Sequence, residues 1–238
     1  GFVRNRPADM GLAPINPIQA ANKPAEEKIG LANGLKMVVF SGRFWPVAIW
    51  AFCVIGISFA VGGLWGGPYL MHVYGLSKTA AGGVLSTFAL ALIFGSPLFG
   101  WLGNRFGRKP VLIACSVLLT AVCGLMSWLV DSLSMTALYV LFFCFFVTGG
   151  AIGPVLAAMS KELFPIAISG TSVGMVNLFP FVGATFFQIV IGSVLSAQSY
   201  GQSQFATVGY QYMFLICLAA AALSLAATVF MKETLERN

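Results

Sequence analysis

Three cations lie close together in a short polar turn between two long apolar segments. The turn reads Gly100-Trp-Leu-Gly-Asn-Arg-Phe-Gly-Arg-Lys-Pro110, and it contains Arg105, Arg108 and Lys109. An arginine guanidinium can donate two parallel hydrogen bonds to a carboxylate, whereas a lysine ammonium acts as a point charge. The turn therefore suits ion pairing, and Glu162 is the acidic residue that the apolar segments should bring to the same side. The alternative is a basic loop that only sets the orientation of the chain.

Polar and aromatic side chains at helical spacing could line a cavity for a solute. These candidates are Ser58, Trp65, Tyr69, Tyr139, Asn177 and Gln188. Amide side chains are costly to expose to lipid, so Asn177 and Gln188 should face protein, water or solute. The alternative is that these residues only pack helices together and that the amides bond across helices, as is common in membrane bundles.

Catalytic and metal-binding chemistry is not indicated. The cysteines lie in apolar segments without the paired spacing of metal ligands, and we expect them to be packing residues. The single histidine, His72, falls at the end of an apolar segment, where an ordinary interfacial role is expected. A serine-type intramembrane hydrolase would need a serine and a histidine together at membrane depth. We therefore expect no enzyme, no cofactor and no metal.

The composition is that of a membrane protein. Hydrophobic residues make up 58% of the chain and charged residues only 8%, against roughly a quarter charged in soluble domains. Apolar runs of about 20 residues can cross a hydrocarbon core of about 30 Å. Such runs occur near 44 to 65, 80 to 102, 111 to 130, 135 to 159, 168 to 195 and 209 to 231. We predict an all-α integral membrane domain of six transmembrane helices over 44–231, between a linker at 1–43 and a tail at 232–238.

The placement of charge predicts the orientation. Lys and Arg side chains concentrate before the first run, in the turn at 105–109, at Lys161 and in the tail, all on one side, whereas the opposite loops contain only Lys78. By the positive-inside rule, both termini should be cytoplasmic. The basic balance thus reflects topology and gives no support to nucleic-acid binding. No acidic or basic residue lies well inside a run, so a proton-coupling group is not expected in this chain.

The cationic turn resembles the Gly-x-Leu-x-Asp-Arg-x-Gly-Arg-Arg/Lys loop of the major facilitator superfamily of secondary transporters. Gly100, Leu102, Arg105, Gly107, Arg108 and Lys109 match it. Asn104 stands where the family usually has Asp, and it keeps an acceptor for a helix N-terminus without the negative charge. Residues 162–177 resemble the family's Glu-x-Phe-Pro…Arg-Gly-Thr…Gly pattern, with Ser169 in place of Arg. The tail at 231–235 resembles the Glu-Thr ending of its last helix.

The resemblance implies a fold and a function. Six helices would form two three-helix repeats of inverted topology, as in one half of such a transporter. The matched motifs indicate the C-terminal half of a secondary transporter that moves a small solute by alternating access. The resemblance implies that the turn, including Gly100 and Asn104, acts with Glu162 as a latch that closes the cytoplasmic side. The lack of acidic residues within the runs favours a neutral solute or an organic anion.

The beginning of the chain suggests a fragment. It starts at Gly1 without a methionine, and the stretch Arg6-Pro-Ala-Asp-Met-Gly11 resembles one that many bacterial members carry between their halves. We therefore expect a missing N-terminal half, or a homodimer in its place, in a bacterial inner membrane. Residues 25–40 could form an amphipathic helix at the cytoplasmic interface or remain a partly ordered linker. The competing interpretation of the whole chain is a self-sufficient six-helix protein, either a channel or an intramembrane hydrolase.

Overall fold

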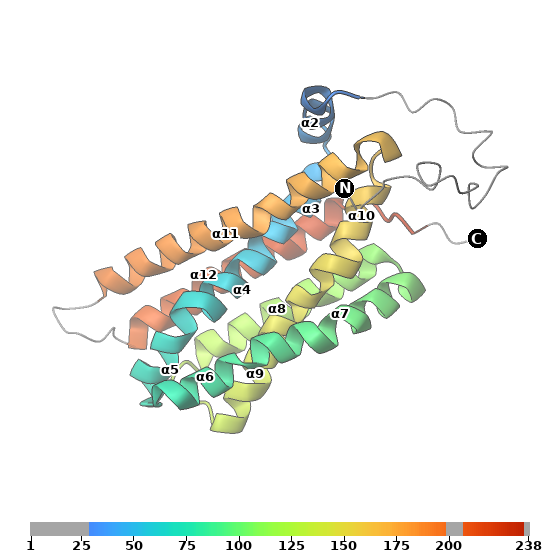
Figure 1. Ribbon diagram of the computed structural model, residues 1–238. Helices are drawn as coiled ribbons and strands as arrows, with labels where there is room; N and C mark the ends of the chain where they lie inside the picture. Colours follow the sequence, from blue (N-terminus) through green and yellow to red (C-terminus); the bar gives the residue numbers. More distant parts are fainter. Residues whose placement is uncertain (1–28, 199–206, 236–238) are drawn as a thin grey trace, which may run out of the picture.

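Every regular element of the computed structural model is a helix over the residues that it describes, 29–198 and 207–235 (Figure 1). Six helical stretches there are long and apolar enough to cross a membrane. We number them spans 1 to 6: Phe44–Tyr74, Lys78–Phe106, Arg108–Trp128, Met135–Glu162, Ile166–Ala197 and Thr207–Phe230. Each overlaps one of the six apolar runs, so this part of the sequence prediction is confirmed.

Spans 1 and 4 are built from irregular pieces, whereas the other spans are mostly regular α-helix. Span 1 comprises α3 (Phe44–Trp50), the π-helix η2 (Ala51–Ile55), α4 (Gly56–Ala60), the π-helix η3 (Val61–Trp65) and α5 (Gly66–Tyr74). Span 4 comprises α9 (Met135–Val147), the 3-10 helix η4 (Thr148–Ala151), the π-helix η5 (Ile152–Leu156) and α10 (Ala157–Glu162). The remaining elements are α2 (Leu31–Val39), α6 (Lys78–Leu85) and α7 (Thr87–Phe106) of span 2, α8 (Arg108–Trp128) of span 3, η6 (Ile166–Ile168) and α11 (Ser169–Ala197) of span 5, and α12 (Thr207–Phe230) of span 6.

Local signals set several helix ends. Ser77 and Ser134 accept hydrogen bonds from the backbone N–H groups of Ala80 and Ala137, and so cap the first turns of α6 and α9. α5 ends at Gly75, which has a φ of 64° and so adopts a left-handed conformation that glycine tolerates best. These loops lie at one end of the bundle, which we call the far end. The opposite end carries α2, α10 and the C-terminal tail, and we call it the charged end (Figure 1).

The six spans form two layers. In the front layer the order is 5, 1, 4, 2: α11 packs on η2 and α4, η2 touches η4 and η5, and α9 packs on α7. In the back layer α12 packs along α8; α12 also contacts spans 5 and 1, and α8 contacts spans 2 and 4. Spans 1 and 4 are accordingly the most buried, at 67% and 56%, while the flanking spans 2 and 5 are only 28% and 33% buried. The front layer therefore has an uncovered side in this chain.

The packing has an internal symmetry. Exchanging spans 1, 2 and 3 with spans 4, 5 and 6 turns the 1–5 contact into the 4–2 contact and leaves the 3–6 contact unchanged. Because three spans cross the bundle an odd number of times, the second triplet begins at the opposite end from the first. This arrangement matches the two inverted three-helix repeats that the sequence resemblance implies.

Buried polar groups tie the layers together. The Trp50 indole donates to Ser116 Oγ at 2.9 Å, and Ser224 Oγ donates to the same oxygen at 3.1 Å, which connects spans 1, 3 and 6. Among the described residues, every buried side-chain nitrogen or oxygen has a hydrogen-bond partner. Polar groups away from water must be satisfied within the protein, and this bundle meets that requirement.

Of the two alternatives for residues 25–40, a helix or a partly ordered linker, the structure has a helix, α2, over Leu31–Val39, and residues 25–28 lie outside the described residues. Gly34 and Val38 are its buried positions, and Gly34 faces Ile168 and Thr171 at the start of span 5. Leu31, Met37 and Phe40 are exposed.

Candidate functional site: the charged end and the front layer

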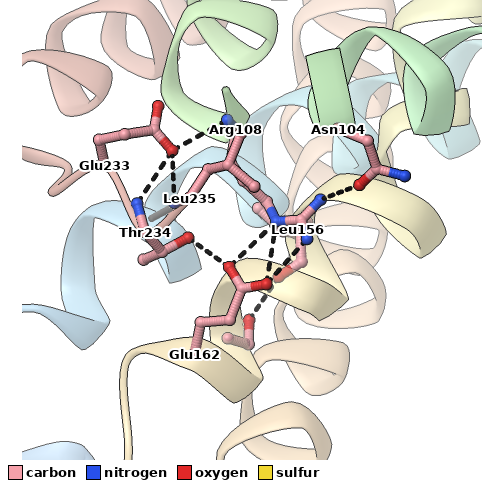
Figure 2. A network of polar contacts seen from close by, with 8 residues as sticks. Asn104, Arg108, Leu156, Glu162, Glu233, Thr234 and Leu235 are labelled. Atoms are coloured by element: carbon pink, nitrogen blue, oxygen red, sulfur yellow. Dashed lines mark hydrogen bonds and ion pairs between the residues drawn. The ribbon is translucent and has the colours of Figure 1, made fainter. Parts of the chain in front are cut away.

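An ion pair joins spans 3 and 4 at the charged end. Arg108 Nη2 lies 2.8 Å from Glu162 Oε1, and Arg108 Nε donates to Glu162 Oε2 at 3.0 Å, so the guanidinium binds the carboxylate in a bidentate manner (Figure 2). The Arg108 side chain is 9% exposed and that of Glu162 is 34% exposed. The sequence predicts a bond from Arg105 or Arg108 to Glu162, and the structure confirms it for Arg108.

The C-terminal tail completes this network. Glu233 accepts hydrogen bonds from the backbone N–H groups of Arg108 and Lys109, the first two residues of α8, at 3.0 Å each. Figure 2 shows the bond from Arg108. Thr234 Oγ1 donates to Glu162 Oε2 at 2.5 Å. A carboxylate at this position accepts hydrogen bonds from amide groups that have no partner within the helix, and its negative charge interacts favourably with the positive end of the helix dipole. The tail thus caps span 3 and holds the ion-paired carboxylate of span 4 at the same time.

Glycine is required at the turn itself. Gly107 has a φ of 111°, and a Cβ there would lie 2.6 Å from Glu233 Oε2. Any side chain would therefore both strain the backbone and push the capping carboxylate away. Lys109 adds a further link, because its Nζ donates to the carbonyl of Val229 in the last turn of α12 at 3.0 Å.

The electrostatics of Glu233 favour its charged form. Partial burial disfavours the carboxylate, but the backbone N–H groups of Leu235, Arg108, Lys109 and Thr234 all donate to it, and together they hold its pKa below the ordinary value of 4.5. Glu233 is thus an anion at neutral pH, as a cap on α8 needs.

The other predicted members of the loop lie around this ion pair. Asn104 Oδ1 accepts from Arg108 Nη1 at 3.3 Å, so the amide braces the ion pair, while the helix N-terminus of α8 is capped by Glu233 instead. Arg105 lies outside the ion pair, and its guanidinium stacks over the rings of Trp101 and Phe106 at 5.4 and 5.6 Å. Gly100 packs against Pro154 of span 4.

Glu233 and Thr234 were missed as site residues. The sequence associates them with the family's tail, but nothing in their spacing places them against the cationic turn. A usable signal exists: an acidic residue shortly after the sixth span must emerge at the same end as a turn between the second and third spans.

The structure brings together two of the predicted cavity residues. The Trp65 indole N–H donates to the backbone carbonyl of Gln188 at 3.0 Å, which joins spans 1 and 5. Asn177 is exposed on α11. Tyr139 is 39% exposed, and its hydroxyl lies against Gly83 near the start of span 2.

Two of the predicted cavity residues lie in the core instead. Tyr69 is fully buried, donates its hydroxyl to the Val130 carbonyl at 2.7 Å and packs among the rings of Phe142 and Phe214. Ser58 is 2% exposed and donates to the Val54 carbonyl one turn earlier. The prediction of a cavity role is wrong for these two side chains.

The physical reason is the π-helical backbone of span 1. A π-turn accommodates an extra residue, so the residues after it are rotated relative to an α-helix of the same sequence. A stripe counted in steps of three and four therefore does not stay on one face across η2 and η3.

No group of three or more His, Cys, Asp or Glu residues that could hold a metal occurs in the part of the chain that the structure describes. The cysteines there are free thiols. The polar site at the charged end consists of side chains and backbone groups that bind one another.

Known proteins resemble this chain in sequence and in fold. A profile described as Major Facilitator Superfamily matches residues 47–237. The chain is 30% identical over 157 residues to the "Probable galactarate/D-glucarate transporter GudP" of Bacillus subtilis, and the alignment covers 63% of this chain and 33% of that protein.

Two solved structures of the xylose transporter XylE have the same fold. The inward-open form from E. coli gives a TM-score of 0.68 at 20% identity and covers 80% of this chain and 48% of XylE. The proton:xylose symporter bound to 6-bromo-6-deoxy-D-glucose gives 0.68 at 19% identity and covers 84% and 46%. This chain therefore spans about half the length of XylE and a third of GudP.

The family profile covers most of the chain, and the six spans, the cationic turn and the Glu-Thr tail are all in place. The chain is an integral membrane protein that belongs to the Major Facilitator Superfamily.

Proposed function

We propose that this chain is the C-terminal half of a secondary active transporter that moves a small polyhydroxylated organic acid across a bacterial inner membrane. The coverage of about half of XylE supports the assignment of a half. The named activity of GudP, a sugar-acid transporter, supports the substrate class. In our proposal the uncovered side of the front layer faces the missing half, and the solute binds between the two halves.

The observation that carries the proposal is the network at the charged end. Arg108, Glu162 and Glu233 connect span 3, span 4 and the tail through direct hydrogen bonds. Such a network stabilises one arrangement of the helix ends and must rearrange when those ends separate. We propose that it is a latch for one of the two states of alternating access, with Asn104 bracing it.

The orientation follows from charge. Lys161, Lys232 and the cationic turn all lie at the charged end, whereas Lys78 is at the far end. The positive-inside rule then makes the charged end cytoplasmic. α2 would lie at that interface, with the exposed side chains of Leu31, Met37 and Phe40 available to the lipid headgroup region.

The cavity residues that remain are Asn177, Gln188, Trp65 and Tyr139. Amide groups suit the hydroxyl groups of a polyhydroxylated solute, because each amide offers both donors and an acceptor. The described parts of the six spans hold no acidic or basic residue away from their ends. A cation that pairs with the carboxylates of an organic acid would therefore come from the missing half.

The test uses the full-length transporter in proteoliposomes and measures uptake of radiolabelled D-glucarate, with D-xylose as the neutral comparison. Saturable uptake of D-glucarate, inhibited by galactarate, supports the proposal. Uptake of xylose alone would favour a neutral solute, and uptake of neither would refute the substrate class. Arg108→Gln should impair the active protein, with Arg105→Gln as the matched control, because Arg105 carries the same charge three residues away and lies outside the ion pair.

A further inference from the structure

The front layer contains two places where helix backbones touch without side chains between them. The first joins spans 1 and 5. A Cβ on Gly56 would lie 2.8 Å from the carbonyl carbon of Gly183, and a Cβ on Gly183 would collide with the carbonyl oxygen of Phe52. These distances are shorter than carbon atoms tolerate, so both positions must be glycine for the two helices to cross this closely.

The second close crossing joins spans 4 and 2. A Cβ on Gly150 would lie 2.8 Å from the carbonyl carbon of Gly95, and a Cβ on Gly95 would lie 2.9 Å from the carbonyl oxygen of Val147. The exchange of triplets described above converts the 1–5 pair into the 4–2 pair. The same device thus occurs twice, at the two helix pairs that the internal symmetry relates, and each pair joins a span of one repeat to a span of the other.

The contact between the two pairs is of another kind. Span 1 touches span 4 through η2 against η4 and η5, so irregular turns meet irregular turns. A Cβ on Gly149 would lie 3.6 Å from Ile55 Cδ1, an ordinary van der Waals distance, and a Cβ on Gly62 would lie 3.1 Å from the Phe146 ring. The neighbours along this contact are therefore side chains, whereas the neighbours at the two crossings are backbone atoms. Each irregular segment also adjoins a crossing glycine: Gly56 directly follows η2, and Gly150 lies within η4, just before η5.

We infer that the front layer consists of two pinned helix pairs, 5–1 and 4–2, which hinge against each other along the seam between η2 and η4–η5 during transport. Backbone contact without side chains holds each pair together, because neither helix can shift without a collision. The π- and 3-10 turns at the seam change their hydrogen-bond pattern more easily than a regular α-helix, which places the bending there. This inference rests on the proposed alternating transport.

The first experiment replaces glycine by alanine at each crossing position in turn and measures the Tm of the full-length transporter. Each span supplies its own control, a glycine at which an added Cβ would meet no atom within 4 Å: Gly63, Gly82, Gly153 and Gly174 in spans 1, 2, 4 and 5. The four crossing variants should lower the Tm, each by about 5 °C. The control variants should leave it unchanged or raise it, because alanine is the better helix former. Equal effects at crossing and control positions would overturn the pinned pairs.

The second experiment tests the hinge with reducible thiol cross-links in a cysteine-free background. Phe52→Cys with Phe187→Cys links spans 1 and 5 beside their crossing, where the centroids of the two phenylalanine rings lie 5.3 Å apart. Ile55→Cys with Gly149→Cys links the two pairs across the seam. The seam link should abolish uptake of radiolabelled D-glucarate and reductant should restore it, while the link within the pair should leave uptake close to that of the unlinked protein.

The two failures can be told apart. If the unmodified transporter takes up no D-glucarate, the substrate proposal fails, and alternation is instead measured by labelling a cysteine at Asn177 with an impermeant maleimide applied from either side. Loss of alternation with the within-pair link, or full alternation with the seam link, would overturn the hinge. Recovery after reduction shows that the linked protein remained folded.

Discussion

Replacing Arg108 by glutamine should release the charged end of the transporter. The variant removes the guanidinium nitrogens, which donate hydrogen bonds to the Glu162 carboxylate at 2.8 to 3.3 Å, and it keeps a side chain of similar length. In the proposed latch the pair breaks when the ends of spans 3 and 4 separate from each other, so its loss should destabilise the closed state of that end more than the open one.

The size of the effect follows from burial. Exposed ion pairs contribute about 0–1 kcal/mol, whereas breaking a buried pair costs about 3–5 kcal/mol. With Arg108 9% and Glu162 34% exposed, water can partly rehydrate the carboxylate that remains. We therefore expect the Arg108→Gln variant to destabilise the closed form relative to the open form by about 1.5–3 kcal/mol, which shifts the equilibrium between the two forms by about tenfold to a hundredfold.

The assay is labelling of Asn177→Cys in a cysteine-free, full-length transporter. Asn177 is exposed and lies eight residues into α11 from the charged end, roughly 12 Å along the helix. An impermeant maleimide applied from that end should react faster in the Arg108→Gln variant. The Arg105→Gln variant should label at the rate of the parent. Equal rates in all three proteins, or the same acceleration in both variants, would refute the assignment of the latch to Arg108.

Three further results are expected. The pKa of Glu233 is lower in the folded protein than its ordinary value of 4.5, so its stabilising contribution is complete above that value and is lost as the pH falls through the lowered pKa. The difference in Tm between the parent and the Glu233→Gln variant should therefore shrink over that acid range. A difference in Tm that is independent of pH would contradict the cap. Asn177→Ala and Gln188→Ala should each raise KM by about 2- to 12-fold, the equivalent of one hydrogen bond, and unchanged kinetics in both would demote these residues to packing. The 238-residue chain reconstituted by itself should show no saturable uptake, since in the proposed architecture the site lies between two halves; uptake by a monomer would contradict this, whereas uptake by a dimer would support the homodimer alternative.

The six spans could be predicted because their signal is local. A run of apolar residues long enough to cross a bilayer is visible without any tertiary contact. The ion pair could be predicted in part, since topology places the turn and Glu162 at the same end. Which arginine pairs was not decided by the sequence: Gly107 breaks the helix between Arg105 and Arg108, so the first ends α7 beside Trp101 while the second starts α8 facing Glu162.

The orientation of the cavity residues of span 1 could not be predicted, because it depends on backbone irregularities that have no local sequence signal. Hydrophobic periodicity assumes the α-helical repeat, so it does not report the π-turns η2 and η3, each of which rotates the residues that follow it. Tyr69 therefore lies in the aromatic core and not on the expected face. The capping role of Glu233 likewise depends on where a tail returns after the last span, which hydrophobic periodicity does not report.

The most direct test of the latch is a pair of experimental structures of the full-length transporter, one with the charged end closed and one with it open. We predict that Arg108 and Glu162 lie within about 4 Å, the limit of an ion pair, in the closed form. In the open form the pair should be broken and Glu233 withdrawn from the start of α8. An ion pair that stays intact in both forms would contradict a gating role and leave it as a structural brace.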